Sequence, residues 1–220
     1  MRQQHEIQVF WTEQASTFDD QPDHGLLDPA VRAAWIARLA EWIGDPPVRV
    51  ADLGCGTGSL SVLLTEVGHE VVGIDLSPAM VEQARKKARR AGFSTAFAVG
   101  DASAPDLATG AFDVVLARHV VWTLPQPVTA LGRWARLLGP HGRFVLVEGR
   151  WSSPSVESAV TSDLPWDGGV PADELIAALA PLFERTDHCQ LSDDSALWGK
   201  AVTDERYAIV AHRPLQARES

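Results

Sequence analysis

The stretch VRVADLGCGTG, residues 48–58, decides the fold of this chain. It begins with an apolar run of the kind that forms a strand buried in a parallel sheet. Glycines at positions 54, 56 and 58 then allow a tight turn in which the backbone can approach a ligand without a Cβ in the way. Residues 59–64 continue at helical spacing, so the turn opens onto a helix N-terminus with free N–H groups. Strand, glycine turn and helix predict a nucleotide-type binding corner.

The spacing of the glycines separates this corner from two phosphate-binding motifs. A dinucleotide fingerprint requires Gly-x-Gly-x-x-Gly, but Ser59 holds the third glycine place and the glycine comes one residue early. A P-loop requires Gly-Lys-Ser/Thr, and no lysine follows Gly58. Because the acidic Asp52 stands just before the glycines, the corner suits a cationic or zwitterionic ligand better than a pyrophosphate. The segment resembles the first motif of class I S-adenosylmethionine (SAM) dependent methyltransferases, Asp-x-Gly-x-Gly-x-Gly.

Later segments follow the order that this resemblance implies. A second predicted strand ends at Asp75, where a carboxylate can accept hydrogen bonds from both hydroxyls of a ribose. A third strand ends just before Asp101, which resembles the acidic residue at the adenine edge in this family. Strands and helices alternate at the expected spacing over residues 48–149. The strands after the first are predicted at residues 71–74, 97–99, 112–116 and 142–148.

The fold class follows from this alternation and from the end of the chain. We predict an α/β fold: a doubly wound, mostly parallel seven-stranded sheet with an antiparallel last strand, helices on both faces and an N-terminal helical cap. Two strand candidates, near 185–191 and 205–212, suit an antiparallel pair that closes the sheet edge. Such an ending is typical of class I methyltransferases, and a dinucleotide dehydrogenase would not need it.

Proline and glycine mark the helix ends within this plan. An amphipathic helix is predicted from Ile7 to Phe18. Later helices are predicted from Pro29 to Gly44, over 78–91, from Pro127 with Val128, Leu131, Trp134 and Leu138 on one face, and from Ala172 to Phe183.

The length suits a single domain, residues 1–220, with a sizeable core. We divide it into an N-terminal helical cap (1–45), a SAM-binding core (46–149), a variable substrate or lid segment (150–170), and a C-terminal helix with antiparallel strands (171–220). A long loop inside a compact domain is unusual unless it binds a ligand, acts as a lid or contains a short helix.

Charge and composition limit the partners. The formal net charge is −10, whereas proteins that bind nucleic acid generally present a basic surface. One basic cluster, Arg85, Lys86, Lys87, Arg89 and Arg90, is interpreted as a solvated helix end, with a phosphate-binding patch as the alternative. The Asn/Asp-Pro-Pro-Tyr signature of base-amino methyltransferases is missing after the fourth strand. We therefore expect a small-molecule substrate and no nucleic acid, and the sequence leaves a homodimer open.

The chain shows no long apolar run and no secretory signal, so no membrane association is expected. Cys55 and Cys189 fit a reducing compartment, and arginine outnumbers lysine, as in GC-rich bacteria. No Cys-x-x-Cys or His-x-x-x-His spacing occurs, so no metal is expected. These features predict a cytoplasmic bacterial protein.

In an open parallel sheet, ligands lie at the carboxyl ends of the strands. The resemblance assigns the amino-acid end of SAM to Asp52, Gly54, Cys55 and Gly56, the ribose to Asp75 with Leu76 and Met80 nearby, the adenine to Asp101 and Ala102, and a place in the pocket wall to Arg118. It also implies that Trp11 and Phe10 close over SAM, as the N-terminal helix does in many relatives, although amphipathic packing alone would explain both residues. Asp52 and Gly58 also fit purely structural roles, Met80 fits the core, and Cys55 fits a small residue tolerated in the turn.

Methyl transfer from a sulfonium is an in-line displacement that needs a held nucleophile and exclusion of water. A base is needed only if the acceptor arrives protonated. His119, which follows the fourth strand, is the first candidate, and His24 is a weaker one. A buried, hydrogen-bonded histidine is the alternative for His119. Trp122, Trp151 and Trp166 are candidates for the wall of an acceptor pocket, although each also suits the core.

These expectations converge on a methyltransferase that acts on a small molecule, with a secondary metabolite or an aromatic, quinone-like compound as candidates. The chain resembles the compact branch that includes ubiquinone and menaquinone methyltransferases. Three alternatives stay open: a SAM-dependent cyclase, a transferase that moves another group, and a non-catalytic module that binds SAM or its product S-adenosylhomocysteine (SAH). A NAD-dependent oxidoreductase is a more distant alternative. The acceptor atom, N, O, C or S, is not specified by the sequence.

Overall fold

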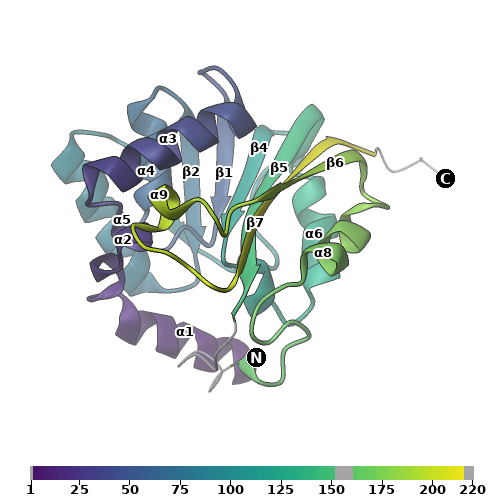
Figure 1. Cartoon of the computed structure of the whole chain (residues 1–220), viewed down its shortest axis with the longest axis horizontal. Coiled ribbons are helices and arrows are strands. Elements are labelled where there is room, and N and C mark those ends of the chain that lie inside the picture. Colours follow the sequence, from purple (N-terminus) through teal and green to yellow (C-terminus); the bar gives the residue numbers. More distant parts are fainter. Residues whose placement is uncertain (1, 152–160, 216–220) are drawn as a thin grey trace.

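A seven-stranded sheet forms the centre of the molecule, which is a computed structural model describing residues 2–151 and 161–215 (Figure 1). The strand order is β3-β2-β1-β4-β5-β7-β6. Neighbours from β3 to β5 pair in parallel, and β7 is antiparallel to both β5 and β6. This arrangement confirms the predicted fold class. The strands are β1 (Arg49–Leu53), β2 (Glu70–Asp75), β3 (Ala96–Val99), β4 (Phe112–Arg118), β5 (Leu138–Arg150), β6 (Phe183–Gln190) and β7 (Glu205–Pro214).

Helices surround the sheet, and several of them precede it in the chain. The first group is α1 (Arg2–Gln14), the 3-10 turn η1 (Phe18–Asp20), α2 (Pro22–Gly25) and α3 (Pro29–Ile43). The others are α4 (Ser59–Glu66), α5 (Pro78–Ala91), η2 (Val121–Thr123), α6 (Pro127–Ala135), α8 (Ala172–Leu179) and α9 (Ser195–Trp198). None of these helices, over the residues the structure describes, is long and apolar enough to cross a membrane.

The sheet is buried on both faces, as alternate residues of β5 show. Phe144 and Leu146 join an apolar cluster with side chains of α6 and α8. Val145 and Val147 join a second cluster with side chains of α3, α4 and α9. Because successive side chains of a strand point to opposite faces, a central strand covered on both sides is continuously apolar.

Two predicted helix ends are wrong. Helix α6 ends at Ala135, and Leu138 begins β5, where it pairs with Phe112. Val128 is 58% exposed, because the buried stripe of α6 is formed by Pro127, Ala130, Leu131 and Trp134. Helix α8 likewise ends at Leu179, before Phe183 begins β6. In both places, apolar residues that fit a helical period belong to a strand. Periodicity alone does not distinguish a helix end from the start of a buried strand in such short apolar runs.

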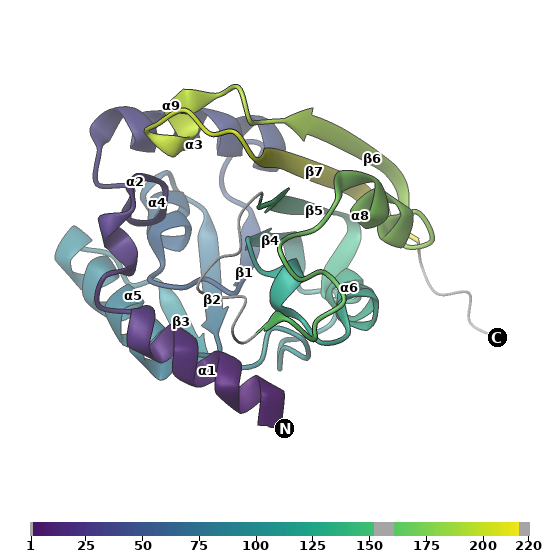
Figure 2. The same ribbon diagram turned by 60° about the horizontal axis from the view of Figure 1, so that its bottom comes forward.

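The N-terminal helix also differs slightly from its prediction. Helix α1 ends at Gln14, and Phe18 begins the separate turn η1. Figure 2 shows α1 lying across the ends of β2 and β3. Hydrogen bonds hold it there, because the side chain of Gln8 donates to the Leu76 carbonyl and the Thr12 and Ser77 hydroxyls share a bond of 3.0 Å. Helix α1 therefore covers the carboxyl end of β2.

The glycine turn depends on its missing side chains. Gly54 and Gly58 have φ angles of 71° and 76°, which favour glycine. A Cβ on Gly54 would lie 2.4 Å from Val120, and a Cβ on Gly58 would lie 2.8 Å from the Cβ of Ala84. The turn is thus packed directly against the segment after β4 and against α5.

We expect Gly58→Ala to lower the free energy of unfolding by roughly 2–4 kcal/mol, through backbone strain and overpacking together. Gly92→Ala is a matched control, because Gly92 has a φ of 82° but nothing within 4 Å of its Cβ position. The control is expected to cost about 1–2 kcal/mol, the backbone part alone. Urea unfolding measures both, and equal losses would contradict the packing described for the turn.

Candidate cofactor and acceptor site

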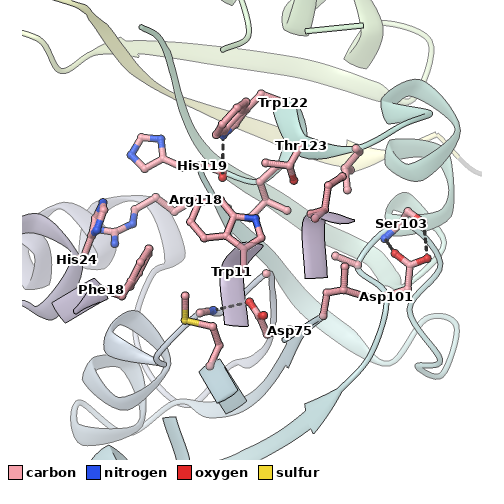
Figure 3. Close-up of a pocket in the computed structure, with 18 of the residues that line it drawn as sticks. Trp11, Phe18, His24, Asp75, Asp101, Ser103, Arg118, His119, Trp122 and Thr123 are labelled. Carbon is pink, nitrogen blue, oxygen red and sulfur yellow. Dashed lines mark hydrogen bonds between the residues drawn. The ribbon is translucent and has the colours of Figure 1, made fainter. Parts of the chain in front are cut away.

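One cavity of about 590 Å³ opens between the cap and the carboxyl ends of the strands, a size typical of small-molecule sites. Figure 3 shows Phe18 and His24 at one end of it and Asp101 and Ser103 at the other. The cavity brings together most of the predicted site residues: Trp11, His24, Gly54, Gly56, Asp75, Leu76, Met80, Asp101, Ala102, Arg118, His119, Trp122 and Trp151. Asp52, Cys55 and Trp166 do not line it.

Asp75 links the end of β2 to the glycine turn. One carboxylate oxygen accepts from the N–H of Gly56 and the other from the N–H of Ser77, both at 2.8 Å. Ser77 in turn caps α5 by accepting from the N–H of Met80. Burial raises the pKa of Asp75, while these two backbone hydrogen bonds lower it. The carboxylate is therefore fixed in direction at the cavity wall.

Asp101 lies at the other end of the cavity and has an unpredicted partner. Its carboxylate accepts from the N–H and the hydroxyl of Ser103, each at 2.8 Å. It also accepts from the Gln4 side-chain amide at 2.7 Å. Because Gln4 belongs to α1, the cap reaches the position that the family resemblance gives to the adenine edge.

The side chains of Asp52 and Cys55 point away from the cavity lining. Asp52 is 4% exposed, and its carboxylate accepts from the hydroxyl of Ser61. Burial raises its pKa to about 6, against the hydrogen bond from Ser61 and the charge of Arg118. Burial also raises the pKa of the Cys55 thiol well above its usual value. These positions fit the structural alternatives for both residues.

Arg118 is a cation in the cavity wall. It donates to the carbonyl of Asp23 at 2.6 Å, and its guanidinium lies 5.0 Å from the ring centre of Trp35. Burial lowers its pKa, while the charges of Asp23 and Asp52 raise it, and no carboxylate of the described residues lies within ion-pair distance of the guanidinium. A buried guanidinium without a direct ion pair can still pair with the carboxylate of a bound ligand.

His119 directly follows β4 and has a left-handed backbone conformation, with a φ of 57°. Both ring nitrogens are buried and have no hydrogen-bond partner. Burial lowers the pKa of His119 well below its usual value, and the charges of Arg206 and Arg118 lower it further. The imidazole is therefore neutral near pH 7, and the predicted alternative of a hydrogen-bonded core histidine does not describe it.

His24 lies in α2 and is also neutral near pH 7. Its ring stacks on Phe18 with centroids 4.3 Å apart, and its Nδ1 atom has no partner. Burial, followed by the charge of Arg118, lowers its pKa to about 4. The cavity thus carries two uncharged imidazoles at the end nearer Arg118.

Of the three tryptophans predicted for the acceptor pocket, two line the cavity and one does not. Trp122 donates to the carbonyl of His119 and meets Trp151 edge to face at 6.2 Å. The guanidinium of Arg206 lies 4.3 Å from the ring centre of Trp151 and pairs with Asp204. Trp166 is outside the lining and donates to Glu174 at 2.6 Å. Part of the predicted lid segment, residues 152–160, lies outside the described residues.

Glu148 supports the segment that carries His119, and the sequence did not suggest this role. It is fully buried, and one carboxyl oxygen accepts from the N–H groups of Val120 and Val121 at 2.9 and 2.8 Å. Burial raises its pKa to about 8, so the carboxyl is largely protonated at neutral pH. It fixes the turn between His119 and Trp122.

Other cavity residues were not predicted as site residues, because they lie outside the methyltransferase-like motifs. They are Gln4, Ile7, Phe18, Ser103, Val120, Thr123, Leu124, Pro125, Asp204 and Arg206. Ser103 was the easiest of them to find, because it lies two positions after Asp101. Within residues 2–151 and 161–215 there is no group of three His, Cys, Asp or Glu side chains that could hold a metal ion.

Comparison with known proteins gives a family match over the core and a fold match over the whole chain. Residues 51–146 match the family described as methyltransferase domain. The demethylmenaquinone methyltransferase of Thermus thermophilus is 40% identical over 104 residues, 46% of this chain and 47% of that protein. The aklanonic acid methyltransferase of a Streptomyces species is 40% identical over 100 residues, 44% and 46% of the two chains. The match spans about half the length of these relatives.

Solved structures extend the similarity beyond the core. The geranyl diphosphate C-methyltransferase of Streptomyces coelicolor, solved with SAH, has a TM-score of 0.72 at 16% identity and covers 98% of this chain and 99% of that one. A [4+2]-cyclase has a TM-score of 0.64 at 23% identity and covers 82% and 80% of the two chains. At these identities the likeness concerns the fold.

We expect Glu148→Gln to gain stability relative to the wild type as pH rises from about 4.5 to 8. The raised pKa means that the stability contributed by the protonated carboxyl is complete below about 4.5 and lost on passing through about 8. Glutamine keeps an oxygen for the two N–H groups but does not ionise. Urea unfolding at several pH values across this range measures the difference in free energy of unfolding. Glu70→Gln, at the exposed start of β2, is the control and should differ from the wild type by a constant amount. A constant difference between wild type and variant would contradict the assignment.

Proposed function

We propose that the protein transfers a methyl group from SAM to a small-molecule acceptor, because residues 51–146 match the methyltransferase domain family and the sheet has the strand order β3-β2-β1-β4-β5-β7-β6. One observation carries the proposal: the glycine turn, Asp75 and Asp101 line a single cavity together with the guanidinium of Arg118. These groups fit a ligand that has sugar hydroxyls and an adenine edge for the two aspartates and a carboxylate for the arginine. Bound SAM would supply an activated methyl group on a sulfonium.

The chain's own residues would hold the cofactor in an extended orientation. Asp75 accepts from the ribose hydroxyls, since its backbone partners leave acceptor capacity on the carboxylate. Asp101 and Ala102 face the adenine, and Arg118 pairs with the carboxylate of the methionine part. Trp11 and other apolar side chains of the cap exclude water from the site.

The acceptor would lie at the mouth formed by His119, Trp122 and Trp151. A neutral imidazole without a protein partner can take a proton from a hydroxyl or an amine of the acceptor. The indole rings suit an aromatic or quinone-like molecule. Two relatives are named for demethylmenaquinone and aklanonic acid, which supports a small molecule of this general kind.

The proposal extends to the partners and the compartment. A formal net charge of −10 favours a small-molecule acceptor over nucleic acid. The two cysteines are not joined to one another, in agreement with a reducing compartment such as the cytoplasm.

A different chemistry on the same fold is the main rival. A [4+2]-cyclase shares the fold, and a fold does not determine the reaction. A cyclase would convert its substrate without consuming SAM, and a binding module would hold SAM without turnover. Methyl-labelled SAM separates these cases in a screen of phenolic and quinone-like acceptors, because only methyl transfer puts the label in the product.

We expect Asp75→Asn to weaken SAH binding by about 1.5–3 kcal/mol, through loss of charge-assisted hydrogen bonds to the ribose. Calorimetric titration with SAH measures the change. Asp106→Asn, at an exposed position beyond β3, is the control and should bind SAH like the wild type. Equal affinities for the wild type and Asp75→Asn would remove Asp75 from the ribose role.

For an acceptor that must lose a proton, His119→Ala should lower kcat by roughly 10²–10⁴-fold. Because the pKa of His119 is well below its usual value, kcat/KM of the wild type should stay level from pH 8 down to about 6.5. SAH affinity should change little. Label transfer at saturating SAM gives kcat, and undiminished transfer by His119→Ala would exclude it as the base.

A further inference from the structure

The sequence indicated that the basic cluster on α5 is a solvated helix end. In the structure, only part of the cluster is solvated. Lys86 and Arg89 pair with Glu82 on the surface of the helix. Lys87 behaves differently, because its side chain is only 21% exposed and reaches the glycine turn. The neighbouring lysines 86 and 87 thus have separate roles.

The ammonium group of Lys87 uses its full donor capacity on three elements. It donates to Asp19 in η1 at 3.0 Å, to the hydroxyl of Thr57 in the glycine turn at 3.0 Å, and to the hydroxyl of Ser59 at the start of α4 at 2.6 Å. Thr57 also donates to Asp19. An ammonium has three donors, so Lys87 has none left for a phosphate ligand. This excludes it from the phosphate-patch alternative.

The segment that Asp19 anchors forms one end of the cavity. Phe18 lines the cavity directly before Asp19 and stacks on His24. A Cβ on Gly56 would lie 3.5 Å from the Phe18 ring, so the ring covers the glycine turn. The carbonyl of Asp23 accepts from Arg118. Residues 18–25 therefore form a covering segment, called the roof below, over the end of the cavity that carries Arg118.

This roof has little structure of its own. Turn η1 has 3 residues and α2 has 4, and neither has a side-chain hydrogen bond at its N-cap. Such short elements are marginal alone and depend on tertiary contacts. The partly buried Lys87–Asp19 pair ties them to the core, and charged hydrogen bonds away from water are stronger than exposed ones.

We propose that Lys87 is a positioning residue of the cofactor site, which latches residues 18–25 over the methionine end of bound SAM through Asp19 and Thr57. The inference rests on the proposed function, because it assumes that the cavity holds SAM or SAH. Lys87 does not touch the cofactor. It keeps Phe18, His24 and the Asp23 carbonyl in place, and so slows escape of the ligand.

The test compares Lys87→Met with Lys86→Met in SAH binding by calorimetry and in SAH dissociation by stopped-flow fluorescence. Methionine keeps the apolar stem and removes the charge. We expect Lys87→Met to lose roughly tenfold in affinity, mostly as faster dissociation, because the charged hydrogen bonds of the latch are gone. Lys86→Met should stay within about twofold of the wild type, as for an exposed ion pair.

Asp19→Asn keeps the test valid if Lys87→Met folds poorly, because Asp19 lies in the cap and outside the core. It should reproduce the faster dissociation, and Asp20→Asn at the exposed next position should not. A lower melting temperature of the ligand-free variants with SAH dissociation like that of the controls would overturn the latch and leave a purely structural contact. Failure of the wild type to bind SAH would overturn the proposed function itself, and the latch with it.

Discussion

The carboxylate of Asp75 is the contact on which the site depends. By accepting from the N–H groups of Gly56 and Ser77, it joins the end of β2 to the glycine turn and to the start of α5. The same turn is held against the sheet by the N–H groups of residues 54 and 55, which both donate to the carbonyl of Ile74. Two adjacent strand ends and two helix starts are thereby fixed around one small space, which is the requirement for binding an extended ligand.

The cap completes this space with one face of α1. Gln4, Gln8 and Thr12 are spaced one helical turn apart, and each bonds to a residue that follows β2 or β3. Trp11 and Ile7 lie beside them in the cavity wall. The N-terminal segment therefore contributes to the site in the same way as the core loops do.

The sequence predicted the sheet, the glycine turn and the positions of Asp75 and Asp101, because these follow from local patterns. Buried strands are apolar runs, and a turn with positive φ angles requires glycine. Features that depend on contacts distant in the chain were missed. Glu148 accepts from a turn that precedes it in the chain by more than the length of a strand. Lys87, on α5, pairs with Asp19 in η1, which is 68 positions earlier. Leu138 satisfied a helical period but belongs to β5, because strand pairing prevailed over local spacing.

A crystal structure with SAH would show directly how the cavity holds its ligand. We expect the ribose against Asp75, the adenine beside Asp101 and Ala102, and the carboxylate near Arg118, with residues 18–25 still covering the glycine turn. SAH bound outside this cavity would contradict the proposed site. So would a ribose whose hydroxyls lie beyond hydrogen-bond reach of Asp75.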